Sequence, residues 1–124
     1  MISQSVLFDS TIVIDALLGR SAAAELLDAH ADRAISVVTW IEVLTGSPEG
    51  EIANTRRFLR AFTRVDLTEA VADEAAALRR RHRLRLPDAV ILASAALHGR
   101  VLLTRDAKDF ERLGRPDVVV PYRL

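Results

Sequence analysis

The sequence predicts an α/β domain in which a mainly parallel sheet carries helices on both faces. Short β-branched or apolar runs recur along the chain, helical patterns separate them, and glycines follow the ends of several of those patterns. Strands that alternate with helices in this way pair in parallel and are joined by right-handed crossovers. With 124 residues, half of them hydrophobic, we expect a single domain over residues 1–124 with a substantial core.

Five runs have the length and composition of strands, beginning with "SVLF" and ending with "DVVVP". They occupy residues 5–8, 34–38, 63–67, 100–104 and 117–121. The helical patterns between them occupy residues 11–18, 21–30, 39–45, 51–62, 69–82, 87–98 and about 107–112. The glycines at helix ends are Gly19, Gly46, Gly99 and Gly114, as expected for C-terminal caps.

The helix predicted at 87–98 is almost entirely apolar. Pro87 can open it, because the N–H that proline lacks has no partner in the first helical turn. Ser94 is the one polar side chain from Ala89 to Leu97. A helix that is apolar on all sides is normally buried, so we expect this helix in the core with Asp88 in its first turn.

Composition narrows the class of protein. The chain has no cysteine, which excludes disulfides and thiolate metal sites. No apolar run approaches the ~20 residues needed to cross a membrane, and the N-terminus lacks the pattern of a signal peptide. We therefore expect a cytoplasmic protein with no membrane association. The formal net charge is zero, so the total charge does not itself indicate nucleic-acid binding.

Four acids are predicted to meet at one edge of the sheet. Asp9 directly follows the first strand, and Asp106 follows the strand at 100–104. Glu42 is expected in the first turn of the helix after the second strand, and Asp88 opens the helix that leads back to the strand at 100–104. All four therefore belong to the edge formed by the carboxyl ends of the strands, where α/β sheets bind ligands. Clustered carboxylates repel one another unless a proton or a cation neutralises them, and an all-oxygen cluster favours Mg²⁺ or Mn²⁺.

Each acid also has a purely structural interpretation. "TWIE" fits a capping box in which Thr39 caps a helix and Glu42 reaches back. Asp106 in "DAKD" can cap a short helix that has Asp109 in its first turn, and Asp88 suits the positive end of a helix dipole. Asp15 is expected on a helix surface. None of these roles explains why four acids should converge on one edge.

The acidic motifs resemble those of the PIN-domain ribonucleases, and in particular the VapC toxins of bacterial toxin–antitoxin pairs. The resemblance rests on "VLFDSTIVIDALL", "ISVVTWIEVLTG" and "LPDAVILASAALHGRVLLTRDAKDF", and it covers nearly the whole chain. Residues 48–85 depart most from the pattern, and "RRRHRLRLPD" has no glycine where many relatives turn before the third acid.

The resemblance implies a three-layer fold with a five-stranded parallel sheet, a homodimer and a Mg²⁺- or Mn²⁺-dependent endoribonuclease. It also implies a VapB-type antitoxin as partner. The implied metal-binding and catalytic acids are Asp9, Glu42, Asp88 and Asp106. Relatives often carry Asn where Asp106 stands, so Asp109 is a further candidate ligand. The hydroxyl groups that the resemblance places in supporting positions are those of Ser10, Thr11 and Thr104.

Metal-assisted hydrolysis of RNA suits these residues, because a bound divalent cation makes a protein nucleophile unnecessary. A haloacid-dehalogenase-type phosphatase would need an acid where Thr11 stands, and a receiver domain would need a lysine at a strand end, whereas Lys108 is the only lysine. A non-catalytic PIN-fold binding module that pairs with a partner protein is the main alternative. Within the basic run "RRRHRLR", Arg83 and Arg85 lie nearest Asp88 and are the candidates for contact with RNA phosphates.

Overall fold

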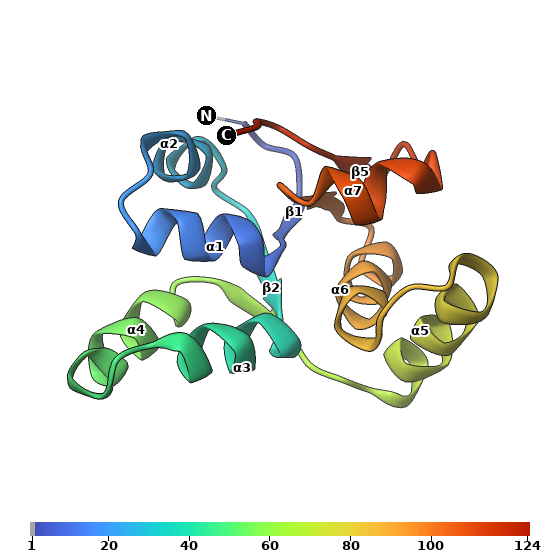
Figure 1. The fold of residues 1–124 in the computed structure, drawn as a ribbon, viewed down its shortest axis with the longest axis horizontal. Helices are drawn as coiled ribbons and strands as arrows, with labels where there is room; N and C mark the ends of the chain where they lie inside the picture. The colour runs from blue at the N-terminus through green and yellow to red at the C-terminus, as the bar shows by residue number, and fades with distance from the viewer. Residues whose placement is uncertain (1) are drawn as a thin grey trace.

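The computed structural model describes residues 2–124 as five strands and seven α-helices around one sheet (Figure 1). The strands are β1 (Val6–Phe8), β2 (Arg33–Ser36), β3 (Thr63–Val65), β4 (Val101–Leu103) and β5 (Val118–Val119). The helices are α1 (Ser10–Leu17), α2 (Ser21–Ala29), α3 (Val37–Gly46), α4 (Ile52–Leu59), α5 (Glu69–His82), α6 (Leu86–Leu97) and α7 (Ala107–Phe110). Short 3₁₀ turns lie at Glu49–Glu51 and Glu111–Leu113. The predicted fold class is confirmed.

All four strand pairings are parallel, and the strand order is β3-β2-β1-β4-β5. The central strand β1 pairs with β2 on one side, where Leu7 lies opposite Ala34, and with β4 on the other, where Phe8 lies opposite Leu103. The chain winds outward from β1 in both directions. The carboxyl ends of β1 and β4 therefore lie side by side where the winding direction reverses, which is the usual ligand site of an open parallel sheet.

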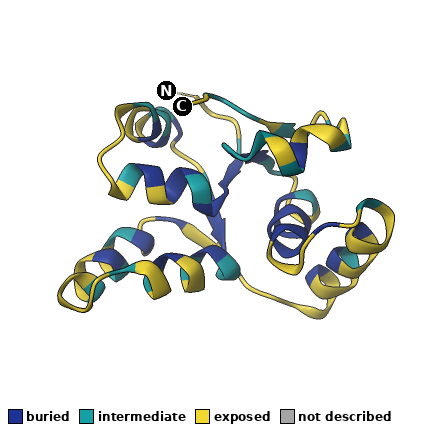
Figure 2. Ribbon diagram, in the orientation of Figure 1, coloured by how far each residue is buried: buried dark blue, intermediate teal, exposed yellow. Residues whose placement is uncertain are grey.

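Alternate residues of the central strands face opposite layers of helices, as the two-residue period of a strand requires. Val6 and Phe8 pack with residues from α1, α2, α3 and α4, whereas Leu7 packs with residues from α5 and α6. Figure 1 shows α1 to α4 on one side of the sheet and α5 and α6 on the other. Figure 2 shows the strands buried between layers whose outer faces are exposed. The sheet is thus the middle layer of three.

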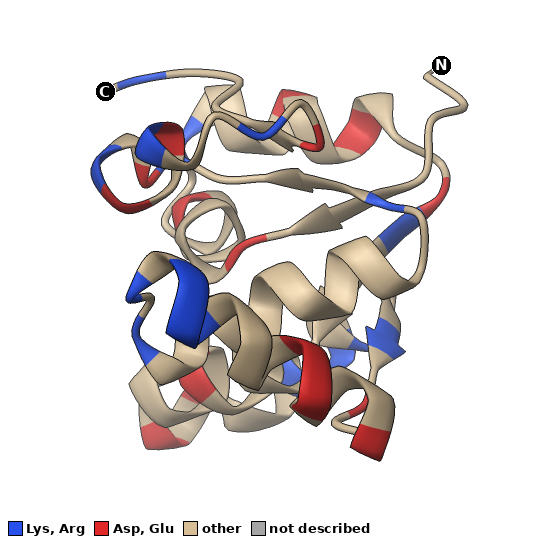
Figure 3. Ribbon diagram, turned by 90° about the vertical axis from the view of Figure 1, so that its right-hand side faces the viewer, with Lys and Arg blue, Asp and Glu red and all other residues tan. Residues whose placement is uncertain are grey.

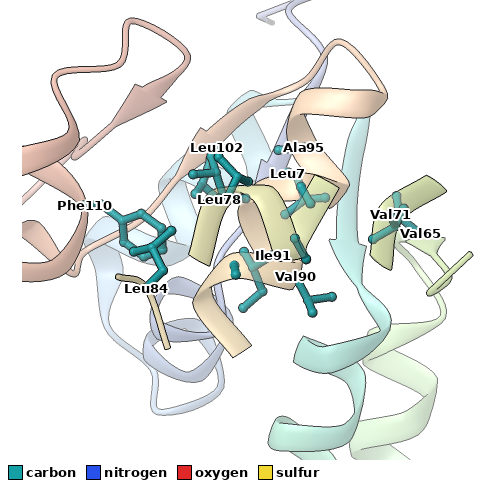
Figure 4. Packing of buried hydrophobic residues seen from close by; sticks show 14 of the residues in the cluster. Leu7, Val65, Val71, Leu78, Leu84, Val90, Ile91, Ala95, Leu102 and Phe110 are labelled. Carbon is teal, nitrogen blue, oxygen red and sulfur yellow. The ribbon is translucent and has the colours of Figure 1, made fainter. Parts of the chain in front are cut away.

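Helix α6 is the most deeply buried helix, as its sequence predicts. Every residue from Asp88 to Ala95 is buried, and Figure 4 shows Val90, Ile91 and Ala95 packed among side chains from α5 and the sheet. The Ser94 hydroxyl donates to the carbonyl of Val90 at 2.7 Å, which satisfies the one polar group in this apolar stretch. The helix starts at Leu86, one residue earlier than expected, so Pro87 is its second residue.

Helix α5 ends without a glycine. Arg83 takes the left-handed cap position at φ 56°, and its N–H bonds to the carbonyl of Arg79. A side chain in this conformation costs on the order of 1 kcal/mol relative to glycine. The turn before Asp88, for which the sequence has no glycine, is therefore formed by Arg83 at a small cost in stability. Within residues 2–124, no helix is both long and apolar enough to cross a bilayer.

Candidate metal centre

The candidate site lies at the carboxyl ends of β1 and β4. Asp9 is the residue after β1 and serves as the N-cap of α1. Asp106 lies three residues after β4 and caps α7, while Asp88 lies in the first turn of α6. Helix α6 leads into β4, so its first turn returns to the edge at which β1 ends. The topology thus explains why acids far apart in the sequence share this edge.

Asp9 is a buried carboxylate held by two hydroxyl groups. Only 4% of the residue is exposed. Its Oδ2 accepts hydrogen bonds from Thr11 Oγ1 at 2.9 Å and from Thr104 Oγ1 at 2.8 Å. Burial raises the pKa of Asp9, although these two hydrogen bonds oppose the rise. The two threonines fix the orientation of the carboxylate.

Asp88, Asp106 and Asp109 form a cluster that we call the acidic triad. Each of them offers a carboxylate oxygen, and these oxygens lie within 4.8 Å of one another. Asp88 is 8% exposed. Burial raises the pKa of Asp88 to about 6. The charges of Asp9 and the other triad members add to this rise, and Arg85 opposes it. Burial is the largest of these effects, and repulsion between neighbouring carboxylates acts in the same direction.

Asp106 has two roles in this arrangement. Its Oδ1 accepts from the backbone N–H of Asp109 at 3.1 Å, so it caps α7 as the "DAKD" pattern predicts. Its carboxylate also belongs to the acidic triad, and burial raises its pKa. The N-cap role and a ligand role are therefore compatible. The hydrogen bond of the cap also holds the Asp106 carboxylate close to the backbone of Asp109.

Glu42 stands apart from the acidic triad. It is exposed, and its Oε1 accepts from Ser10 Oγ at 2.7 Å, while Ser10 Oγ also lies 2.9 Å from Thr39 Oγ1. The capping-box interpretation of "TWIE" is wrong. Helix α3 already begins at Val37 and is capped by Ser36, whose Oγ accepts from the N–H of Val38. Glu42 therefore lies in the second helical turn rather than the first, and its carboxylate is held by Ser10, the residue that follows Asp9.

The two arginines proposed for RNA contact lie in different surroundings. Arg85 reaches into the acidic triad, where Nη2 lies 3.1 Å from Asp109 Oδ2 and 3.4 Å from Asp88 Oδ2. Arg83 is exposed at the cap of α5. It lines an open hollow with Arg79 and Arg80. Figure 3 shows the basic residues gathered at the C-terminal end of α5. Arg85 thus neutralises acids, and Arg83 is exposed on the basic surface.

The donor set suits a hard divalent cation. The triad supplies carboxylate oxygens from Asp88, Asp106 and Asp109, and the buried Asp9 is near enough for its charge to act on Asp88 and Asp106. Mg²⁺ and Mn²⁺ prefer such oxygen ligands. Burial is the main cause of the raised pKa values of Asp9, Asp88 and Asp106, and the charges of neighbouring acids add to it.

The sequence interpretation missed Asp15. It was expected on a helix surface but is only 1% exposed. Its carboxylate accepts from Arg105 Nε at 2.6 Å and Nη2 at 3.1 Å, and from the Tyr122 hydroxyl at 2.7 Å. Arg20 Nε lies 3.2 Å away. Burial would raise the pKa of Asp15, but hydrogen bonds from Arg105 and Tyr122 hold that pKa below its usual value. The apolar neighbours in "IVIDALL" were the only sequence signal of its burial.

Comparison with known families agrees with this geometry. The sequence matches the family described as "PIN domain" over residues 6–116, which includes all the candidate acids. The chain belongs to the PIN domain family. It is similar to Ribonuclease VapC19 of Mycobacterium tuberculosis, with 33% identity over 125 residues that cover 94% of this chain and 98% of the relative.

Solved structures with this PIN fold include components of toxin–antitoxin assemblies. A chain from a structure called "Toxin-antitoxin complex from Klebsiella pneumoniae" superposes with a TM-score of 0.91 at 42% identity, covering 97% of this chain and all of that one. A chain of VapBC2 from Rickettsia felis, bound to a promoter DNA fragment, superposes with a TM-score of 0.78 at 17% identity over 98% of this chain and 99% of that one. At that lower identity the likeness shows the fold alone.

Proposed function

We propose that this protein is a metal-dependent endoribonuclease that acts as the toxin of a toxin–antitoxin pair. Asp9, Glu42, Asp88 and Asp106, together with Asp109, are the acids of its Mg²⁺ or Mn²⁺ site. The observation that carries the proposal is the acidic triad beside the buried Asp9 at the carboxyl edge of the sheet. The similarity to Ribonuclease VapC19 supports RNA as the substrate.

The chain's own residues have defined tasks in this proposal. Thr11 and Thr104 hold the Asp9 carboxylate, and the Asp106 cap holds the backbone of Asp109. A bound divalent cation lowers the pKa of a water molecule and stabilises charge on the phosphoryl oxygens. One carboxylate of the acidic cluster would accept a proton through a water molecule during hydrolysis.

Glu42 has a more peripheral role than the other acids. It is exposed and held by Ser10, which follows Asp9 directly in the chain. We assign it to the rim of the metal site, where it would contact a bound cation through water rather than as one of the triad ligands. Magnesium commonly keeps several of its waters in protein sites, so a carboxylate outside the triad could still contribute to binding the ion.

RNA would approach the site along the basic end of α5. Arg79, Arg80 and Arg83 line an open hollow there, and Arg85 connects this surface to the acidic triad. Arginine recognises phosphate through several planar donors. Single-stranded or looped RNA is the form in which bases are accessible, and we propose it as the substrate.

The antitoxin would bind across the same edge of the protein. A groove of about 370 Å³ is lined by apolar side chains of α1 and α3, including Ile14, Leu17 and Leu18, and also by Glu42 and Glu51. We propose that an antitoxin segment lays apolar side chains in this groove and extends an arginine towards the acids. The position of Arg85 between Asp88 and Asp109 illustrates that a guanidinium fits there. The relative from Klebsiella pneumoniae comes from a toxin–antitoxin complex.

The homodimer implied by the resemblance remains a prediction. Sedimentation of the purified protein at several concentrations tests it directly. A mass corresponding to a single chain at every concentration would contradict it.

Cleavage of a mixed RNA pool by the purified protein tests the activity. We expect products only with Mg²⁺ or Mn²⁺ present, none in EDTA, and a large loss for Asp9→Asn and Asp88→Asn. Asp73→Asn is the matched control, because Asp73 is an exposed acid on α5 outside the site. Its variant should cleave like the parent.

Two outcomes would contradict the proposal. Cleavage that survives EDTA would exclude the metal mechanism. A protein that binds an antitoxin tightly but cleaves no RNA with either metal would favour the alternative of a non-catalytic PIN-fold binding module.

A further inference from the structure

The buried carboxylate of Asp15 is not explained by the metal site alone. It lies on α1, six residues after Asp9, and it accepts three hydrogen bonds from Arg105 and Tyr122 besides its ion pair with Arg20. A buried ion pair by itself contributes little net stability. The ion pair between Arg105 and Asp15 matters more for geometry than for stability, because a forked guanidinium–carboxylate contact fixes the position of both partners.

Arg105 connects this ion pair to Asp9. Its side chain is fixed by Asp15, and its backbone N–H donates to Thr11 Oγ1 at 3.1 Å. Because the Thr11 hydroxyl accepts this bond, its own proton is directed to Asp9 Oδ2. Thr104 is arranged in the same way, since it accepts from the N–H of Asp106 at 2.9 Å and donates to the same Asp9 oxygen.

The loop at residues 104–106 is therefore fixed to α1 at two levels. Side chains join Arg105 to Asp15, and the hydroxyl groups of Thr11 and Thr104 join the loop backbone to Asp9. This loop carries Asp106, which belongs to the acidic triad. A shift of Arg105 would move Asp106 relative to Asp9 and would also release the Thr11 hydroxyl from its fixed orientation.

We propose that Asp15 is a positioning residue for the metal site, acting through Arg105 and Thr11 to set the geometry of Asp9 and Asp106, with Tyr122 bracing its carboxylate. This inference rests on the proposed function. It assigns a role in metal binding to a carboxylate that does not belong to the triad, and it links the C-terminal segment that carries Tyr122 to the site.

The test compares Mn²⁺ affinity, measured by calorimetry with the metal alone, at a temperature where each protein is fully folded by circular dichroism. Asp15→Asn keeps the shape and removes the charge. We expect its Mn²⁺ affinity to fall by about 10-fold, the lower end of the effect of residues that orient metal ligands. Tyr122→Phe should give a smaller loss, because it removes one of the bonds to Asp15.

Asp32→Asn is the matched control. Asp32 accepts from Arg100 Nη1 at 2.9 Å and Ser5 Oγ at 2.6 Å. These residues precede strands, so this ion pair lies at the amino edge of the sheet, away from the acids. The variant should lose stability without losing Mn²⁺ affinity, which separates positioning from general support of the fold.

A double-mutant cycle tests whether Asp15 acts on the metal site through Thr11. If Asp15 acts through Thr11, the Mn²⁺ losses of Asp15→Asn and Thr11→Val will be less than additive when combined. Parent affinity in folded Asp15→Asn, or equal losses in Asp15→Asn and Asp32→Asn, would overturn the inference while leaving the proposed function intact. If Asp15→Asn does not fold, Arg105→Lys, which keeps the charge but removes the fork, decides in its place. A parent protein that binds no Mn²⁺ would overturn both proposals.

Discussion

Replacing Asp88 with Asn should change how the stability of the protein depends on pH. Burial and the neighbouring acids raise the pKa of Asp88 from 3.8 to about 6. The folded protein therefore keeps this proton up to about pH 6, whereas the unfolded chain releases it near pH 4. Between these values the folded state binds more protons, so stability falls as pH rises through this window. Asn has no proton to release, so the variant lacks this loss.

The size of the effect follows from the pKa shift. Each pKa unit corresponds to about 1.4 kcal/mol, so a rise of about two units sets a ceiling of about 3 kcal/mol on the contribution of Asp88. The Asp88 side chain is 12% exposed at the rim of the site, and solvent there screens the charges, so we expect about 1–2 kcal/mol. Without metal, the free energy of unfolding of Asp88→Asn should gain this amount on the parent between pH 4 and pH 7.

Urea unfolding in EDTA at several pH values from 4 to 8, followed by the fluorescence of Trp40, measures this difference. Asp73→Asn changes an exposed acid on α5, and its free energy of unfolding should follow the parent's dependence on pH throughout this range. Added Mg²⁺ should stabilise the parent more than Asp88→Asn, because a cation that binds only the folded state raises its stability. Parallel curves for the parent and Asp88→Asn between pH 4 and 7 would refute the reasoning about burial and charge at this edge.

Four further outcomes are expected. Arg85→Gln removes a guanidinium that competes with a cation for two triad carboxylates, so Mn²⁺ affinity by calorimetry should rise about fivefold. An unchanged affinity would contradict this competition. Arg83→Gly should preserve stability, because glycine suits the left-handed cap conformation. If Arg83 contacts a phosphate, the variant should bind RNA more weakly, and the slope of log affinity against log salt concentration should fall by about 1. A slope equal to the parent's would exclude that contact. Leu92→Ala, at a fully buried position of α6, should lower the free energy of unfolding by about 2–5 kcal/mol, and a loss below about 1 kcal/mol would show that the core closes around the cavity. Ser36→Ala removes the N-cap of α3 and should cost about 1 kcal/mol in the same urea assay, whereas an unchanged midpoint would show that this cap contributes nothing.

The order and type of the elements could be predicted because their signals are local. The runs at 5–8 and 100–104 each contain three consecutive apolar residues, as expected for strands buried on both faces. These residues form the paired strands β1 and β4. The apolar stretch after Asp88 is explained by a helix packed on the sheet under a second helix. The rule that ligands bind at the carboxyl edge of a parallel sheet predicts that Asp9, Glu42, Asp88 and Asp106 share that edge. In the structure Asp88 and Asp106 belong to the acidic triad and Glu42 does not.

The start of α3 could not be predicted to the residue. "SVVTWIE" offers two hydroxyl side chains that can cap a helix, Ser36 and Thr39, and each is compatible with local helix chemistry. Pairing of Ser36 with Val65 in the sheet ends β2 at Ser36, which makes that residue the cap. Thr39 then lies inside the helix, and its hydroxyl lies beside Ser10 rather than at a helix end.

The sequence by itself determined the alternation of strands and helices and the edge at which the acids gather, because periodicity and chain direction are properties of neighbouring residues. Tertiary structure alone decided which acids lie close together and what neutralises them. Asp15 became a buried ion-pair partner because Arg105 and Tyr122 come to it from 90 and 107 residues away. Glu42 lies outside the triad, in the second turn of α3, where its carboxylate accepts from Ser10. Burial and charge pairing depend on the distance between residues in space, which separation along the chain does not specify.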